Sequence, residues 1–329
     1  MASRAGDAGA AAGLAVEGGA GTLAQRGRAR LVAGLAWLAC RLPERPLIGL
    51  ASVAGEAWYR LAPARAARAR RNLQRVATWL DAAGLGPAAA RAAARDRAAL
   101  ERLVRSAFRH QARYYLELLR VRTMTRAYVR ERLVIETPEA VAEAFAERPL
   151  ILVGLHFGAI ELPSLMLVTE VGRPTAPMET IADGPLQRYI ASSRAAVGIN
   201  LVAIRRSRSE LLAAIRRGEP VGLVADRDIA GGGLAVELFG APARLPIGPA
   251  LLALEAGGPL NVAAVRRTAP GRYAGRLERL PLPPAGSHRE RVTALLEAEA
   301  RAFERVVATA PAQWWAVFFP IWPDLETVA

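Results

Sequence analysis

The sequence predicts an α/β protein with a mostly parallel central sheet flanked by helices. Beyond residue 149, short β-branched runs such as "PLILVG", "PVGLVAD" and "PLNVAAVRR" alternate with segments of helical pattern. Alternation of strands and helices is typical of a parallel sheet with helices on both faces. The 329 residues, 52% of them apolar, suffice to bury a large core and exclude disorder for most of the length.

Composition divides the chain into a leader and one domain. Residues 1–28 are rich in Ala and Gly without periodicity, which predicts a disordered leader. Residues 29–329 form the predicted domain. Within it we expect an apolar, membrane-associating helical hairpin at 29–65, a helical region at 66–148 and an α/β core, expected to be catalytic, at 149–329.

The segment 31–62 is mostly apolar, but "RLPER" divides it into two pieces. A single span needs about 20 uninterrupted apolar residues, and each piece is too short. A helical hairpin on a bilayer surface would place Trp37, Trp58 and Tyr59 at the interface. Two buried core helices fit the pattern equally well. The arginine-rich "RAARARRNLQRV" that follows is typical of a segment beside an anionic membrane surface.

The helices and strands after this segment follow from periodicity. Apolar residues at helical spacing predict an amphipathic helix over 98–120, and Ser287 is a typical N-cap for a later helix. Strands are expected within 149–158, 174–180, 199–204, 220–226, 259–267 and 272–282, and helices within 186–198, 207–218 and 248–258.

The charge balance predicts anionic partners. All 44 basic residues are arginine, against 30 acidic ones, which gives a net charge of +14. Nucleic acid is not expected, because no recognition motif is present and aromatic residues are only 6%. Anionic lipid or a phosphorylated molecule is favoured. The single cysteine, Cys40, excludes a disulfide within the chain and fits a reducing compartment.

The stretch "GLHFGAIELP" contains the strongest candidate for proton-transfer chemistry. His156 would end a strand and Glu161 would begin the next helix, with Gly158 permitting a tight turn. Glu161 could then reach back to the imidazole, hold its tautomer and stabilise the imidazolium. An H-x4-E pattern alone is common by chance. No nucleotide-binding loop and no Cys/His set with metal spacing is present, so neither a cofactor nor a metal is predicted.

Further motifs follow in a characteristic order: R-x3-G-I from Arg194, D-R-D at 226–228, a glycine loop, and "FGAPARLPIGPALLAL". Together with "RRNL" and "QWWAVFFPIW", this order resembles the bacterial lysophospholipid acyltransferase superfamily. Within that superfamily it is similar to the branch of lipid A acyltransferases and phosphatidylinositol mannoside acyltransferases. The resemblance spans Leu31 to Pro323.

The resemblance implies transfer of a fatty acyl group from acyl-CoA or acyl carrier protein to a hydroxyl of a membrane glycolipid. His156 would be the general base and Glu161 its partner carboxylate. It also implies a peripheral or monotopic enzyme on the cytoplasmic face of the cell's inner membrane. Arg194, Asp226, Arg227 and Asp228 match the family's substrate-binding blocks, and either arginine suits a bidentate phosphate clamp.

Two departures leave the acceptor open. Ala159 and Ile160 stand where the family often has Asn-Trp, and "LFG" replaces the common "FFG". The stretch "DRDIAGGGLAVELFG" favours a phosphatidylinositol mannoside as acceptor. The alternatives are a lipid A-type or lysophospholipid acyltransferase, a hydrolase, and a non-catalytic lipid-binding relative.

Overall fold

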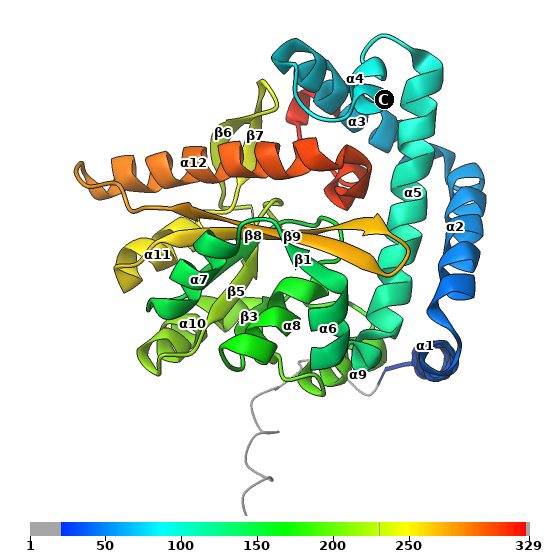
Figure 1. Cartoon of the computed structure of the whole chain (residues 1–329), viewed down its shortest axis with the longest axis horizontal. Coiled ribbons are helices and arrows are strands. Elements are labelled where there is room, and N and C mark those ends of the chain that lie inside the picture. The colour runs from blue at the N-terminus through cyan, green and yellow to red at the C-terminus, as the bar shows by residue number, and fades with distance from the viewer. Residues whose placement is uncertain (1–20, 230, 327–329) are drawn as a thin grey trace, which may run out of the picture.

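The computed structural model describes residues 21–229 and 231–326, and its centre is a seven-stranded sheet in the order β1-β9-β8-β2-β5-β3-β4 (Figure 1). Strands β8, β2, β5, β3 and β4 are mutually parallel, whereas β9 runs antiparallel to β8, and β1 pairs parallel to β9. The predicted α/β class with a mostly parallel sheet is therefore confirmed. Its strands are β1 Leu133–Ile135, β2 Ile151–Gly154, β3 Thr175–Met178, β4 Asn200–Ala203, β5 Val221–Val224, β8 Leu260–Ala269 and β9 Arg272–Leu280.

A separate two-stranded hairpin, β6 Leu234–Leu238 with β7 Ala241–Leu245, packs against α12. The glycine loop and "LFGAPAR" form this hairpin, which the sequence patterns did not predict. Strand β1 likewise joins the sheet from outside the predicted core at 149–329. The longer helices are α1 Leu23–Arg41, α2 Glu44–Leu61, α3 Pro63–Ala83, α5 Arg97–Leu119, α8 Glu161–Glu170, α9 Gly184–Ala195, α10 Ser207–Arg216 and α12 His288–Thr309. The shorter ones are α4 Ala88–Ala92, α6 Arg126–Arg132, α7 Pro138–Ala146 and α11 Gly248–Ala256.

Helices cover both faces of the sheet. Helix α12 lies along one face, with α3 and α4 beyond it, while α6, α7 and α8 lie on the other (Figure 1). The predicted N-cap of α12 is present, because the Ser287 hydroxyl accepts a hydrogen bond from the backbone N–H of Glu290 in a capping box. Helix α11 packs against α10, α12 and β8, and its Ala250, Leu252 and Ala253 are buried in the core.

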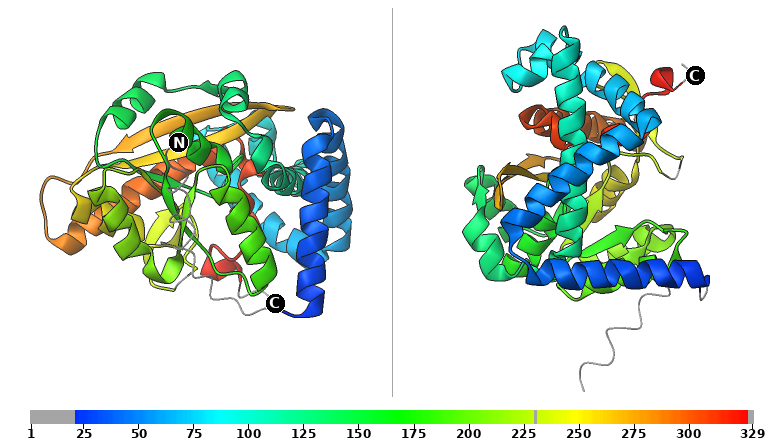
Figure 2. Two further views of the ribbon diagram at one scale, coloured as in Figure 1. Left: turned by 90° about the horizontal axis from the view of Figure 1, so that it is seen from below. Right: turned by 90° about the vertical axis from the view of Figure 1, so that its right-hand side faces the viewer.

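The N-terminal helices differ from the predicted hairpin. Helix α1 begins at Leu23, inside the predicted leader, and residues 1–20 lie outside the described residues. Helix α1 packs against α9 and α5, while α2 packs mainly against α5. The two helices diverge from the short turn that joins them instead of packing along each other (Figure 2), so the hairpin is not confirmed. No described helix is long and apolar enough to cross a bilayer.

A C-terminal segment of short 3₁₀ turns, residues 311–322, packs into the middle of the molecule. The buried Asn72 of "RRNL" donates from its amide nitrogen to the carbonyls of Val317 (2.9 Å) and Phe319 (3.0 Å). An isolated bridge pairs Trp314 with Phe157, next to His156. These contacts bring the tryptophan-rich segment to the carboxyl end of β2, where functional groups gather in parallel sheets.

Candidate active site

His156 and Asp226 meet at the carboxyl edge of the sheet. His156 follows β2 and Asp226 follows β5, and these strands are neighbours with Gly154 opposite Val224. The Nδ1 atom of His156 lies 2.6 Å from Oδ1 of Asp226. The backbone N–H of His156 donates to Oδ2 of the same carboxylate (2.9 Å), as does the indole N–H of Trp314 (2.7 Å). The carboxylate thereby orients the ring and leaves Nε2 for chemistry.

Asp226 is held as an anion despite its burial. It is 2% exposed, and burial by itself would raise its pKa. The charge of His156 and the hydrogen bonds from His156 and Trp314 outweigh burial, so the pKa of Asp226 lies below its ordinary value. An ionised carboxylate at Nδ1 stabilises the imidazolium that forms when Nε2 takes a proton.

The structure corrects the predicted partner of His156. Glu161 does not reach back to the imidazole, because α8 begins at Glu161 and directs its side chain toward α9. There Oε1 of Glu161 lies 2.5 Å from Nη2 of Arg194, and both Glu161 oxygens accept from Nε of Arg194 at 3.1 and 3.2 Å. The pair is largely buried. Burial would lower the pKa of Arg194, but the Glu161 charge raises it. Arg194 is therefore engaged and is no free phosphate clamp.

The loop that carries His156 is tightly fixed. Gly158 adopts φ +53°, and a Cβ there would lie 2.0 Å from the Val265 carbonyl oxygen, so only glycine fits. The Gly158 N–H donates to the Gln313 carbonyl (3.0 Å), and the Trp315 N–H donates to the His156 carbonyl (2.9 Å). Pro163 falls in the first turn of α8, where its missing N–H has no intrahelical partner.

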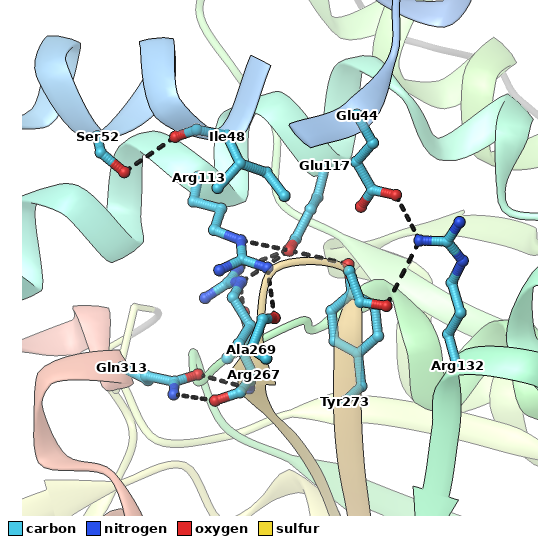
Figure 3. Close-up of polar contacts among 12 residues, drawn as sticks. Glu44, Ile48, Ser52, Arg113, Glu117, Arg132, Arg267, Ala269, Tyr273 and Gln313 are labelled. Carbon is cyan, nitrogen blue, oxygen red and sulfur yellow. Dashed lines mark hydrogen bonds and ion pairs between the residues drawn. The ribbon is translucent and has the colours of Figure 1, made fainter. Parts of the chain in front are cut away.

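A buried polar network holds this loop, and Figure 3 shows its members Arg267, Glu117 and Gln313. Nη2 of Arg267 donates to the Gly158 carbonyl (2.8 Å) and pairs with Glu117 (2.5 Å). Gln313 bonds both the N–H and the carbonyl of Arg267, each at 2.8 Å. Arg267, Glu117, Gln313 and Trp314 had no role predicted from the sequence. The only signal was the tryptophan-rich end, quoted above for the resemblance.

The three residues of the D-R-D block make different contacts. Asp226 is the partner of His156. Asp228 accepts from the backbone N–H groups of residues 231–233 at 2.9 to 3.2 Å and so holds the glycine loop. Arg227 stacks on Phe319, with its guanidinium carbon 3.6 Å from the ring centroid. The predicted site residues thus form two groups, His156 with Asp226 to Asp228 and Glu161 with Arg194.

A cavity of about 110 Å³ adjoins the loop. Its walls come from β2, β3, β5, β8, α8 and α9 and are mostly apolar, including Leu152, Val153, Leu167 and Ile199. Leu155 and Phe157, the residues on either side of His156, line it together with the Glu161–Arg194 pair. Within residues 21–229 and 231–326, no group of three His, Cys, Asp or Glu side chains is placed to hold a metal ion.

Residues 23–319 match the family described as bacterial lipid A biosynthesis acyltransferases. The chain belongs to this family. A phosphatidylinositol mannoside acyltransferase of Mycolicibacterium smegmatis is 29% identical over 217 residues, which cover 64% of this chain and 70% of that protein. A protein of the same name from Mycobacterium tuberculosis is 29% identical over 155 residues, 45% of this chain and 49% of the relative. The lipid A acyltransferase family and these relatives identify the chain as an acyltransferase.

Proposed function

We propose that this acyltransferase moves a fatty acyl group from an acyl thioester to a hydroxyl of a phosphatidylinositol mannoside, with His156 as general base. The His156–Asp226 pair carries this proposal, because the imidazole is oriented by an ionised carboxylate and its side chain is 14% exposed. The names of the two mycobacterial relatives support the acceptor class. The donor is acyl-CoA or acyl carrier protein, and neither metal nor cofactor takes part.

In the proposed step, Nε2 of His156 takes the proton of the acceptor hydroxyl as the oxygen attacks the thioester carbonyl carbon. The carbon–sulfur bond breaks as the tetrahedral intermediate collapses, and the departing thiolate takes the proton from the imidazolium. Asp226 remains ionised throughout and stabilises the transient positive charge. The products are an ester and a free thiol.

The cavity beside the loop is a candidate site for the acyl chain. Its mostly apolar walls suit a hydrocarbon chain, and they include Leu155 and Phe157, the sequence neighbours of His156. The Glu161–Arg194 pair would then shape one end of this cavity as a positioning pair, without taking a proton from the acceptor.

The protein would act as a peripheral enzyme at the cytoplasmic face of the membrane. The side chains of α1 support contact with a membrane. Exposed leucines recur at 31, 35 and 38, a spacing that puts them on one helix face, and the exposed Leu42 follows directly after the helix, while the buried Ala36 and Ala39 face the protein. We define Leu31, Leu35, Leu38 and Leu42 as the α1 leucine stripe.

The test uses purified protein with a labelled donor, either palmitoyl-CoA or palmitoyl acyl carrier protein. Three acceptors are offered: a mannosylated phosphoinositide, a lipid A precursor and a lysophospholipid. We expect label in the mannosylated lipid with the wild type and a loss of at least about a hundredfold in His156→Ala. Thermal unfolding of the variant checks its fold. Transfer retained by a folded His156→Ala would overturn the mechanism, label only in free fatty acid would indicate a hydrolase, and label in another lipid would change the acceptor.

A further inference from the structure

Two arginines from distant parts of the chain meet on one aromatic ring beside the site. Arg227 follows β5, and Arg65 lies in the first turn of α3. Their guanidinium carbons lie 3.6 and 5.4 Å from the centroid of the Phe319 ring. Arg65 also lies 5.0 Å from the ring centroids of Trp58 and Phe318. Aromatic faces thus hold both cations in place.

Neither guanidinium is neutralised by a carboxylate. Over the described ranges 21–229 and 231–326, no Asp or Glu oxygen lies within 4 Å of Arg65 or Arg227, whereas Arg68, one turn further along α3, pairs with Glu326 at 2.9 Å. The Nε atom of Arg65 is buried and has no hydrogen-bond partner. Burial lowers the pKa of both arginines. At Arg227 the charges of Asp226 and Glu179 offset part of this effect, and at Arg65 Tyr115 raises the pKa while the charges of Arg68 and Arg227 lower it further.

The pair lies close to the reacting groups. Arg227 is next to Asp226 in sequence, and Asp226 is bonded to His156 and Trp314. The Phe319 ring centroid lies 6.4 Å from that of Trp315, which in turn lies 4.3 Å from the His156 ring. Two partly buried, unpaired cations at this position raise the local potential and favour an anion between them.

We propose that Arg65 and Arg227 together bind one phosphate group of a substrate at the mouth of the His156 site. Planar guanidinium forks match the oxygens of a phosphate ester or diester, and charge-assisted bonds of this kind are strong. Under the proposed function, on which this assignment rests for its ligand, two substrates carry such a group. They are the coenzyme A donor and the phosphodiester of the acceptor headgroup.

The experiment measures binding without turnover, using coenzyme A as the donor probe and glycerophosphoinositol as the acceptor probe. Neither carries an acyl group, so neither can react. Binding to the full chain is followed by tryptophan fluorescence, because Trp58 and Trp315 lie beside the pair. The variants are Arg65→Gln and Arg227→Gln. Arg68→Gln is the matched control, since it removes the same charge from the same helix but at an arginine that Glu326 already holds.

We expect each of Arg65→Gln and Arg227→Gln to weaken one probe about tenfold, with Arg68→Gln close to the wild type. The fold-loss of probe affinity in the double variant should be smaller than the product of the fold-losses in the two single variants, because both arginines hold the same anion. Weaker binding of coenzyme A by the variants assigns the site to the donor, and weaker binding of glycerophosphoinositol assigns it to the acceptor. Unchanged affinity for both probes in the two folded variants, or no binding by the wild type, would overturn the proposal.

Failure of the proposed function is seen separately. If the wild type binds a probe through both arginines but transfers no acyl group to a mannosylated phosphoinositide, the anion site stands and the assigned acceptor is wrong.

Discussion

At the scale of single residues, the buried carboxylate of Asp226 accepts three hydrogen bonds, two from His156 and one from Trp314. Glu161, five residues from His156 in sequence, instead neutralises Arg194. The two carboxylates therefore make different contributions, which substitution by the isosteric amide separates.

Asp226→Asn should lower kcat by about a hundredfold or more, because a neutral amide neither fixes the tautomer of His156 nor stabilises its protonated form. Glu161→Gln leaves the Asp226 contact intact and removes the charge that compensates the buried Arg194, so its main expected effect is lower stability. The measurement is kcat and KM as a function of pH beside thermal unfolding. A greater loss of kcat in a folded Glu161→Gln than in Asp226→Asn would contradict this assignment.

Glu299 on α12 is a second buried carboxyl near Asp226. It is fully buried, and neither of its oxygens has a hydrogen-bond partner. Burial, and then the charge of Asp226, raise the pKa of Glu299 well above its ordinary value. The folded protein thus holds a proton there that the unfolded chain releases above its own lower pKa. The stability gained from this proton is complete below the unfolded pKa and is lost as pH rises through the folded pKa.

Glu299→Gln should therefore flatten the dependence of stability on pH. In the wild type, the free energy of unfolding falls by up to about 1.4 kcal/mol per pH unit between the unfolded and folded pKa values of Glu299. Glutamine cannot ionise, so this decrease is absent from the variant. Denaturant unfolding of wild type and variant from pH 4 to pH 9 measures the difference, which should grow with pH. Parallel curves over this range would show that Glu299 does not retain its proton in the folded state.

The place of His156 just after a buried strand was predictable from the apolar run before it, but its partner was not. Asp226 lies 70 residues away in sequence. It reaches His156 only because β5, and not the next strand in sequence, lies beside β2. Strand order is a non-local property that periodicity does not contain. Glu161 is much nearer to His156 in sequence, but helix α8 directs its side chain toward Arg194.

At the scale of elements, Arg267 joins β8, α5 and the loop after β2 through Glu117 and the Gly158 carbonyl (Figure 3). Its side chain is 1% exposed and that of Glu117 is 8% exposed. Removing one member of a buried ion pair leaves the other charge uncompensated, which is costly.

Arg267→Met should destabilise the fold by up to about 3–5 kcal/mol, because it leaves the buried Glu117 carboxylate with Arg113 alone, whose Nε lies 3.6 Å from Oε1. The double variant Arg267→Met/Glu117→Leu should recover little of that loss, because it removes the carboxylate that also compensates the buried Arg113. Denaturant unfolding measures both. A double variant close to the wild type in stability would contradict this account of the network.

Elements with clear periodicity were predicted well, as α5 at 97–119 against 98–120 shows. Elements stabilised mainly by tertiary contacts were not. Strand β1 has three residues and pairs with β9 far along the chain, and the β6–β7 hairpin follows a glycine loop fixed by Asp228. Helices α1 and α2 formed as expected near the apolar runs, but their mutual packing depends on α5 and α9.

At the scale of the whole molecule, the net charge of +14 and the α1 leucine stripe suit an anionic membrane surface together. Long-range charge attraction is screened by salt, whereas insertion of apolar side chains is not. The two contributions are therefore separable by experiment.

Leu31→Gln, Leu35→Gln and Leu38→Gln together should weaken binding to anionic vesicles at least about tenfold, because each leucine loses apolar area buried in the bilayer. Leu85→Gln, at an exposed leucine outside α1, is the control. Cosedimentation with vesicles at low and high salt measures both contributions. Wild-type and triple-variant binding should each fall with salt, and an unaffected triple variant would show that α1 does not face the membrane.

The contacts of residues 311–322 also bear on how the protein is made. His156 and Asp226 are both synthesised before Trp314, Gln313 and Trp315, whose bonds fix the loop that carries His156. A nascent chain that has emerged only as far as α12 already contains His156 and Asp226 but lacks the groups that hold this loop. Because domains fold as their chain leaves the ribosome, activity should arise only after residues 311–322 have emerged and docked onto a sheet that is already formed.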